Sequence, residues 1–315
     1  MKILVAGATG AIGRPLLPRL RAAGHDVAAI TRDERRADAL RAAGVQAHVA
    51  DVYDRDAVVA ACVAAAPEVV VHQLTALPKA LDVRRYRAAM RETNRLRAEA
   101  TPHLVAGARA AGARRIVAQS ISFITAPEGP PVHDEDARPF TDAPAQLRDA
   151  VAATLALEET TLAATDLDPV VLRYGFFYGP GTYYAPDGGT AQEIRARRFP
   201  LVGGGTGISS FVHVEDAADA TVAALAGGAG GRYNVTDEEP AAAAQWLPHA
   251  AACLGARRPL RVPALVGRLA AGPHAVHFAT TLRGNSGARF RETFGWTPAY
   301  PSWREGFRQA LGAPA

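Results

Sequence analysis

The chain has 315 residues, of which 49% are hydrophobic, and its 35 Lys and Arg against 31 Asp and Glu give a formal net charge of +4 at pH 7. This composition is ordinary for a globular protein and excludes a disordered or fibrous chain. Because the basic residues are scattered and no stretch approaches the ~18 apolar residues of a membrane span, we expect a cytoplasmic protein without nucleic-acid or membrane partners.

The first half of the chain alternates short apolar runs with longer helical stretches, which is the pattern of βα units that build a parallel sheet. We expect strands at residues 3–6, 27–31, 46–50, 68–71, 115–119 and 169–173. We expect helices at 11–23, 85–111 and 146–164, the first two kinked or broken at Pro18 and Pro102. The predicted class is therefore α/β with a doubly wound parallel sheet.

The second half of the chain is less regular. A proline-rich loop covers 126–144, and its length favours a functional role beside a substrate. Short apolar runs at 211–214 and 232–235 are expected to rejoin the sheet as strands. The sequence thus predicts one domain from 1–173 together with 211–240, and a smaller discontinuous C-terminal part from 174–210 and 241–315.

A glycine-rich turn directly follows the first strand and opens the first helix. Gly7, Gly10 and Gly13 are spaced G-x-x-G-x-x-G, which suits a tight turn, close approach of a pyrophosphate and close helix packing, with the helix N-terminus facing the negative charge. A purely structural glycine turn is the alternative. The candidate cofactor contacts in this turn are Gly7, Thr9, Gly10, Ala11, Ile12 and Gly13.

The end of the second strand predicts which dinucleotide is bound. Thr31 and Arg32 stand where an NAD enzyme places an acidic residue, and a hydroxyl and a guanidinium suit a 2′-phosphate, with Arg36 nearby. We therefore expect NADP as the cofactor and the first domain as its binding domain. Asp51, followed by Val52, is a candidate for the adenine contact; a turn or cap residue is the alternative reading of Asp51.

With these residues in place, the chain resembles the extended short-chain dehydrogenases, the superfamily of sugar-nucleotide epimerases and dehydratases, over essentially its full length. The segments that carry the resemblance, besides the glycine turn, are 69–72, 93–94, 172–181, 211–216, 233–235 and 294–298. The resemblance implies a Rossmann-type fold. It also implies cofactor contacts near the nicotinamide from Leu74, Thr75, Tyr174, Gly175 and Phe176.

In that family a Ser or Thr after the fifth strand and a Tyr-x-x-x-Lys on the next helix carry the proton chemistry. Ser120 matches the serine and is the predicted catalytic residue, with Ser122 as its neighbour; a hydroxyl that caps the strand end is the alternative. Register against Glu158 puts Ala150 and Thr154 at the other two positions. The only lysines are Lys2 and Lys79, and neither lies four residues after a tyrosine.

Loss of these residues disfavours a sugar-nucleotide epimerase or dehydratase, since both need a strong acid/base group. The chain is similar to tyrosine-less ketoreductases of aromatic polyketide pathways. The predicted function is NADPH-dependent reduction of a carbonyl on an aromatic, apolar small molecule, with the proton supplied by a substrate hydroxyl. A noncatalytic NADP-binding regulator is the alternative. His72, Tyr183 and Tyr184 are further candidate proton donors, and no metal site is expected.

Overall fold

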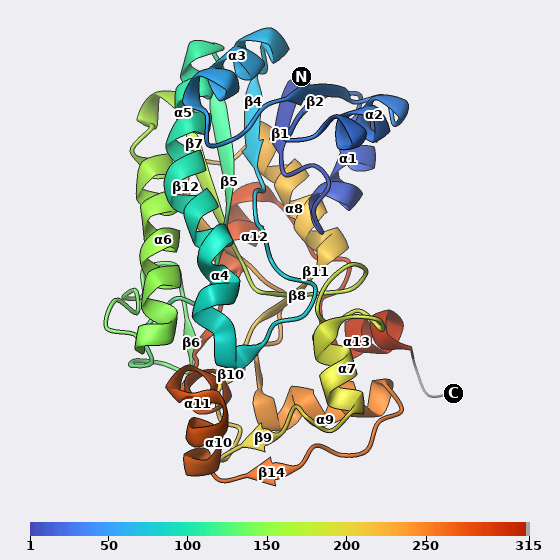
Figure 1. Cartoon of the computed structure of the whole chain (residues 1–315), viewed down its shortest axis with the longest axis vertical. Coiled ribbons are helices and arrows are strands. Elements are labelled where there is room, and N and C mark those ends of the chain that lie inside the picture. Colours follow the sequence, from blue (N-terminus) through green and yellow to red (C-terminus); the bar gives the residue numbers. More distant parts are fainter. Residues whose placement is uncertain (313–315) are drawn as a thin grey trace.

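The computed structural model describes residues 1–312, and its centre is a seven-stranded parallel sheet in the order β12-β7-β5-β4-β1-β2-β3 (Figure 1). Its strands are β1 (Lys2–Ala6), β2 (Asp26–Thr31), β3 (Gln46–Val49), β4 (Val69–His72), β5 (Arg115–Ile121), β7 (Pro169–Tyr174) and β12 (Gly231–Val235). The order reverses between β1 and β4, so a crevice for ligands is expected at the carboxyl ends of these two strands. The predicted α/β class and the six strands predicted in the first half are confirmed.

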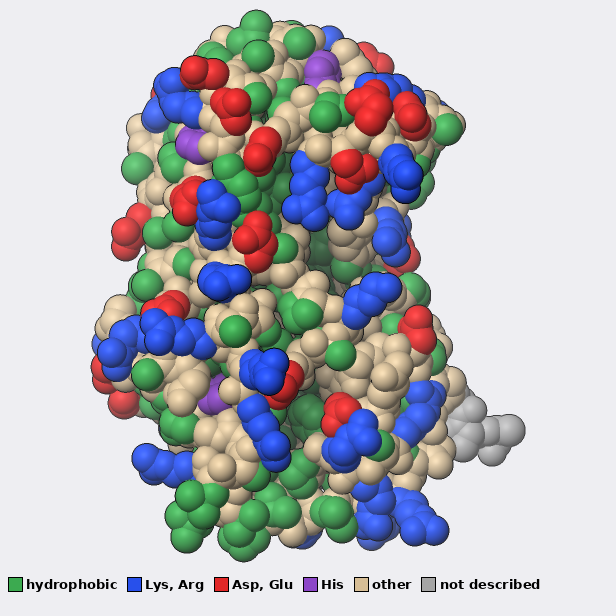
Figure 2. All heavy atoms as spheres, viewed as in Figure 1, with side chains coloured by type: hydrophobic (Ala, Val, Ile, Leu, Met, Phe, Trp, Pro, Cys, Tyr) green, Lys and Arg blue, Asp and Glu red, His purple; other side chains and the backbone are tan. Residues whose placement is uncertain are grey.

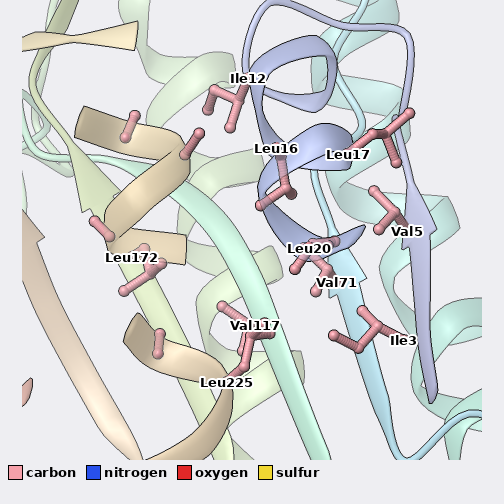
Figure 3. Close-up of a cluster of buried hydrophobic side chains, with 14 of the residues drawn as sticks. Ile3, Val5, Ile12, Leu16, Leu17, Leu20, Val71, Val117, Leu172 and Leu225 are labelled. Carbon is pink, nitrogen blue, oxygen red and sulfur yellow. The ribbon is translucent and has the colours of Figure 1, made fainter. Parts of the chain in front are cut away.

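Helices cover both faces of the sheet, which is why its strands are apolar runs rather than alternating ones. One face carries α1 (Gly13–Ala22), α2 (Glu34–Ala42) and α8 (Val214–Ala226); the other carries α3 (Arg55–Ala65), α4 (Tyr86–Arg95), η2 (Leu96–Ala100), α5 (Thr101–Ala110) and α6 (Ala145–Leu162). Figure 3 shows the first layer, where Leu16 and Leu20 of α1 meet Val5 and Val71 of the sheet. These side chains are fully buried and fix α1 behind the glycine turn.

The long helix expected at 85–111 is present but changes its winding in the middle. Residues 96–100 form a π-helical segment, η2, directly before α5. Pro102 lies in the first turn of α5 and has no N–H to donate to the preceding turn, so the wider winding begins where the α-helical ladder would fail. Pro18, by contrast, is accommodated inside a continuous α1.

The remaining elements form the lower part of the molecule in Figure 1 and the edges around the sheet. They are η1 (Val83–Arg85), β6 (Val132–His133), η3 (Thr165–Leu167), β8 (Phe176–Tyr178), α7 (Gly189–Arg195), β9 (Leu201–Val202), β10 (Ile208–Ser209), β11 (Phe211–His213), β13 (Ala241–Ala242), α9 (Ala243–Cys253), β14 (Arg261–Val262), α10 (Ala264–Ala271), α11 (Pro273–Thr280), β15 (Gly284–Asn285), α12 (Ala288–Phe294) and α13 (Trp303–Leu311). Phe211, Trp246, Trp303 and Phe307 belong to a separate aromatic core in this part.

Of the two strands expected to rejoin the sheet, only one does. β12 pairs with β7 as predicted, but β11 pairs in parallel with β8 in a two-stranded sheet of its own. The reason is the turn at Gly175, after which the chain continues as β8 and offers a new edge at Phe176 to Phe211. The strand at 211–213 therefore lies beside β8, outside the large sheet.

The loop at 126–144 is tied to the far end of the chain. Its strand β6 pairs with β15, and Asp136 forms an ion pair of 2.5 Å with Arg289. Pro127 accepts a hydrogen bond of 2.7 Å from the Arg283 guanidinium through its carbonyl oxygen. Among residues 1–312, no helix combines the length and the apolar character that crossing a membrane requires.

Candidate active site

The glycine turn between β1 and α1 has the geometry of a dinucleotide cradle. Gly7 has φ +97°, and a Cβ there would lie 2.5 Å from the Gln73 carbonyl oxygen; a Cβ at Gly13 would collide with the carbonyl oxygen of Gly7. A Cβ at Gly10 would meet only the Gly7 oxygen, at 3.3 Å. The first and third glycines are thus required by the protein's own packing, whereas Gly10 leaves the backbone open toward a ligand.

The space-filling view is hollowed between the α4 and α5 side and the α1 and α2 side of this face, with apolar side chains in its depth and Lys and Arg on the α1 and α2 border (Figure 2). Ile12 is 4% exposed and packs in the core, so any contact it makes to a cofactor comes from its backbone. Thr9 and Ala11 are partly exposed at the turn. These residues fit a pyrophosphate at the N-terminus of α1.

The carboxyl end of β2 presents the predicted adenosine-side residues. Thr31 is 8% exposed, and Arg32 is exposed and makes no ion pair within residues 1–312. Arg36 is already paired with Asp33, at 3.1 Å, and Asp33 also caps α2. Arg32, directly after β2, and Arg35 are therefore the exposed guanidinium groups of this segment without an ion pair within residues 1–312.

The residues predicted near the adenine and the nicotinamide differ in how far they are exposed. The carboxylate of Asp51 accepts a hydrogen bond of 3.0 Å from the Tyr53 N–H, which is the turn role considered above, while the residue stays exposed. Val52, Leu74 and Thr75 are partly exposed near the carboxyl ends of β3 and β4.

Tyr174 and its neighbours lie after β7. The Tyr174 ring is fully buried and its hydroxyl hydrogen-bonds to Thr221, 2.7 Å away, while its carbonyl oxygen accepts the Ser122 N–H. Its side chain is therefore directed into the core rather than toward a ligand. Gly175 packs against the Ser210 backbone, with no room for a Cβ, and the partly exposed ring is that of Phe176.

The hydroxyl of Ser120, the predicted catalytic group, is engaged inside the protein. It donates a hydrogen bond of 2.6 Å to Glu158, and Ser120 is 0% exposed. Glu158 in turn binds Arg173 and lies 2.9 Å from Arg232. The hydroxyl of Ser120 is therefore part of a buried polar network, and its catalytic role stays a prediction.

Ser122 is the better placed of the two serines. It follows β5 at the carboxyl edge of the sheet, and its Oγ has no hydrogen-bond partner within residues 1–312 although it is buried. A buried hydroxyl without a partner is uncommon and costly, and it is often satisfied by a ligand. The next residue, Phe123, opens onto the aromatic cluster described below.

Ala150 and Thr154 of α6 stand at the positions predicted to match the family tyrosine and lysine, and a guanidinium from another helix lies against Thr154. Arg97, in the π-helical segment η2, donates a hydrogen bond of 2.9 Å to the Thr154 hydroxyl. Arg97 is 4% exposed. Sequence reasoning missed it, and the only signal was Pro102, which predicted an irregularity in that helix.

His72 belongs to the same region but is not free to act. Its Nδ1 accepts the Leu74 N–H at 3.2 Å, so Nε2 carries the proton and donates to the Thr101 hydroxyl at 3.0 Å. Thr101 then donates to the carbonyl oxygen of Arg97. Burial, and secondarily the Arg97 charge, lowers the pKa of His72 to about 4, so the ring is neutral and orients η2.

Three phenylalanine side chains form a cluster next to Ser122. The rings of Phe123 and Phe176 stack with centroids 4.2 Å apart, and Phe278 of α11 meets both edge-on at 6.3 and 6.2 Å. All three are partly exposed. Tyr183 donates to the Pro78 carbonyl oxygen and burial raises its pKa to about 12, whereas the ring of Tyr184 packs on Phe307.

No set of three or more His, Cys, Asp and Glu side chains in the part of the chain that the structure describes is arranged to hold a metal ion. Cys62 and Cys253 are both buried and unpaired with each other. The polar side chains described near the carboxyl end of β5 include the hydroxyls of Ser122 and Thr154 and the buried guanidinium of Arg97.

Comparison with known proteins gives both a family match and close relatives. The sequence model of the NAD dependent epimerase/dehydratase family matches residues 3–236. A 3-diazoavenalumate denitrifying reductase of a Streptomyces species is 52% identical over 307 residues, which are 97% of this chain and 99% of the relative. A 4-hydroxy-2-methyl-3-oxo-4-farnesyl-3,4-dihydroquinoline-1-oxide ketoreductase of Stigmatella aurantiaca is 30% identical over 253 residues, 76% of this chain and 69% of the relative.

Solved structures agree in fold. A UDP-glucose 4-epimerase of Thermotoga maritima has a TM-score of 0.76 at 19% identity, covering 99% of this chain and 97% of that one. A UDP-glucose 4-epimerase of Thermus thermophilus, in complex with NAD, has a TM-score of 0.73 at 23% identity, covering 99% and 98%. At these identities the likeness extends to the fold alone.

Proposed function

Because the chain belongs to the NAD dependent epimerase/dehydratase family, we propose that it is an NADPH-dependent reductase of an aromatic small molecule that replaces an aryl diazo group by hydrogen. The observation that carries this proposal is the 52% identity, over nearly the whole chain, to a denitrifying reductase of a diazo compound. The relative's reaction class fits the residues of the site in two respects, the missing proton donor and the aromatic cluster.

The glycine cradle and the end of β2 support the choice of cofactor. Gly10 leaves space for the pyrophosphate, and Thr31 and Arg32 present a hydroxyl and an unpaired guanidinium where a ribose-binding carboxylate would repel a 2′-phosphate. When bound there, NADPH supplies a hydride. Ser122, Phe176 and the backbone after β4 follow the carboxyl ends of β5, β7 and β4, and this supports assigning them to the nicotinamide and substrate side.

The chemistry of a diazo substrate explains why the site can lack a Tyr/Lys pair. An aryl diazonium ion and a hydride give an arene and dinitrogen: one C–H bond forms, the C–N bond breaks, and its electron pair leaves with N2. Atoms and charge balance without a proton. A general acid that contributes roughly 10² to 10⁴ to carbonyl chemistry is therefore dispensable, and Ala150 at its position has no consequence for the rate.

The cluster of three phenylalanine rings favours a flat substrate. Phe123, Phe176 and Phe278 provide ring faces and edges, and aromatic rings prefer such stacked and edge-on partners. A sugar nucleotide, which is polar along its whole length, finds no matching set of charged side chains in this cluster.

Ketone reduction is the second candidate, favoured by the 30% identity to a ketoreductase. Hydride addition to a ketone leaves an alkoxide that must be protonated, and in this site the proton would come from a hydroxyl of the substrate beside the carbonyl. A noncatalytic NADP-binding regulator remains the outcome if neither substrate class reacts.

The two reactions separate in one experiment. The protein is incubated with NADPH deuterated at C4 and, in parallel, with the diazonium derivative of 3-amino-4-hydroxybenzoic acid or with an ortho-hydroxy aryl ketone. We expect deuterium on the ring carbon that carried the diazo group, with one NADPH consumed for each N2 released. Cofactor oxidation without ring deuterium would refute the proposal, and turnover of the ketone but not of its methyl ether would establish the second candidate.

A further inference from the structure

Two side chains from the segment 86–97 pack on α6: Arg97 binds Thr154, and Tyr86 belongs to the cluster that contains Ala150. We propose that Arg97, assisted by Tyr86, binds an oxygen anion of the substrate beside the carbon that accepts the hydride. This inference rests on the proposed function, because it takes the substrate to be a reducible aromatic compound. The shared chemistry is an oxyanion, either the phenolate of an ortho-diazophenol or the alkoxide that forms from a ketone.

Arg97 is a buried cation without a carboxylate of its own. It is 4% exposed, and within residues 1–312 its guanidinium donates only to the neutral hydroxyl of Thr154. Glu158 is near enough to influence its charge but is already bound by Arg173 and Arg232. A buried charge left with one neutral partner is costly unless a ligand completes it.

The charge of Arg97 persists at neutral pH. Burial lowers the pKa of its guanidinium to about 10, which still leaves it protonated in a neutral solution. Because the carboxylate of Glu158 already binds the two guanidinium groups of Arg173 and Arg232 and only influences the charge of Arg97 from a distance, this part of the interior has an excess of positive charge. A guanidinium offers a planar set of donors that suits phenolate, carboxylate and alkoxide oxygens.

The backbone around Arg97 is held in an unusual but fixed form. The π-helical turn at Leu96–Ala100 shifts the side chains out of the α-helical register, and such turns are often found at functional sites. Thr101 donates to the Arg97 carbonyl oxygen, and His72 at the end of β4 donates to Thr101. This chain of hydrogen bonds links Arg97 to the strand edge where the nicotinamide is expected.

Tyr86 completes the pair from the other end of α4. Its ring is 8% exposed and packs with Leu147, Ala150 and Val151, so it fills the side of α6 from which the family tyrosine would project. Its hydroxyl makes no hydrogen bond within residues 1–312, although the charge of Arg97 lowers its pKa while burial raises it more. A protonated phenol beside a guanidinium supplies a second donor to the same oxygen.

The charge of Arg97 would affect the reaction itself as well as the binding of the substrate. In an ortho-diazophenol, an Arg97 contact to the phenolate oxygen retains negative charge on oxygen and leaves the diazo-bearing carbon electrophilic toward hydride. In a ketone, the same contact stabilises the alkoxide as it forms. In both cases the cation acts on the atom adjacent to the reacting carbon or one bond beyond it.

Binding of a simple phenol tests this without any turnover. The complex of the protein with NADP⁺ is titrated with 4-nitrophenol above the pKa of the free phenol, and separately with 4-nitroanisole, its uncharged methyl ether. We expect the phenolate to bind about 10- to 100-fold more tightly than the ether, the range of a charge-assisted hydrogen bond. Absorbance of the bound phenolate gives the binding curve and its ionisation state together.

The variants assign the preference to Arg97. Arg97→Met should abolish it, Arg97→Lys should retain part of it, and Tyr86→Phe should reduce it about threefold to tenfold. Arg95→Met is the matched control, since Arg95 is exposed on the same helix and pairs with Glu99; it should bind like the native protein.

Two results would overturn the inference: a native protein without preference for the phenolate, or an Arg97→Met protein that retains it. If circular dichroism shows that Arg97→Met does not fold, the test relies on Arg97→Lys and Tyr86→Phe. A native-like affinity of both variants for the phenolate would then refute the roles proposed for Arg97 and Tyr86. A preserved phenolate preference with no ring deuteration by NADPH would refute the proposed reaction and leave the anion site standing.

Discussion

The guanidinium of Arg173 binds both carboxylate oxygens of Glu158, with Nε 2.7 Å from Oε1 and Nη2 2.6 Å from Oε2, and neither side chain is more than 2% exposed. Arg232 lies against the same carboxylate, and Ser120 donates to it. One buried carboxylate thus joins β5, β7 and β12 to helix α6. Removal of its charge would leave two guanidinium groups without a counter-ion.

We expect Glu158→Gln to lower the free energy of unfolding by about 3–5 kcal/mol, the usual cost of breaking a buried ion pair from one side. Urea denaturation measures this directly. Asp166→Asn, which breaks the exposed ion pair with Arg109, should change the stability far less. Equal effects of the two substitutions would show that burial does not govern the Glu158 network.

The two serines after β5 should separate stability from turnover. Ser122→Ala removes a hydroxyl without a partner in the folded chain and should slow the reduction of a ketone by ~10²-fold, as loss of one donor to a developing oxyanion does. Ser120→Ala removes a hydrogen bond to Glu158 and should lower stability by about 1–3 kcal/mol while kcat changes little. Steady-state kinetics and urea denaturation of both variants measure the two effects. Slower turnover in Ser120→Ala together with lower stability in Ser122→Ala would contradict this assignment.

The native protein should bind NADPH more tightly than NADH, and Arg32→Ala should narrow that difference about 10- to 100-fold by weakening NADPH alone. The reason is that Arg32 has no ion pair within residues 1–312, so its charge is available to the 2′-phosphate. Fluorescence titration gives both affinities. Arg41→Ala, on the helix that follows Arg32, is the control, because Arg41 is already paired with Glu34 and Asp38. Similar affinities of the native protein for both cofactors would defeat the prediction.

Buried histidines should make the protein less stable in mild acid. Burial lowers the pKa of His72, His213 and His277 to about 4, below the usual 6.5, so between these values the unfolded chain binds protons that the folded chain does not. Their contribution is therefore complete above pH 6.5 and decreases as the pH falls toward 4. Each histidine accounts for about 1.4 kcal/mol per pH unit in that window.

A substitution isolates one of them, which is needed because burial raises the pKa of Glu135, Asp216 and Asp237 and these carboxyl groups act in the opposite direction. His213 caps α8 by accepting the Glu215 N–H, and asparagine is also a good cap. Between pH 6.5 and 5, the unfolding free energy of His213→Asn should fall about 2 kcal/mol less than that of the native protein. Parallel curves for the two proteins would contradict the shift assigned to His213.

Much of the sheet could be predicted from the sequence because its determinants are local. An apolar β-branched run followed by a helix specifies a βα unit, and the strands at 3–6, 27–31 and 115–119 lie within two residues of β1, β2 and β5. The partner of a short strand is not local. Strand 211–213 pairs with β8 because a turn at Gly175 creates that edge, and no periodicity in the sequence encodes this.

The site residues also divide into those with local and those with non-local determinants. The glycine turn and the end of β2 are contiguous motifs, so their candidates could be named in advance. Ser120 and Ser122 differ only in what each hydroxyl faces, which depends on Glu158 from a helix 38 residues away. Arg97 reaches Thr154 across 57 residues of sequence, and a lone arginine in an arginine-rich helix carries no mark of burial.

The pairing of β6 with β15 also sets an order for assembly on the ribosome. All seven strands of the large sheet are contained in residues 2–235, and a nascent chain that has emerged to that point holds every strand of the dinucleotide side. Strand β6 must wait for Gly284–Asn285, and Asp136 for Arg289. In the order of synthesis the large sheet comes first and the partner strand of the 126–144 loop comes last, so a chain that ends before Gly284 would contain every strand of the large sheet while this loop lacks its partner.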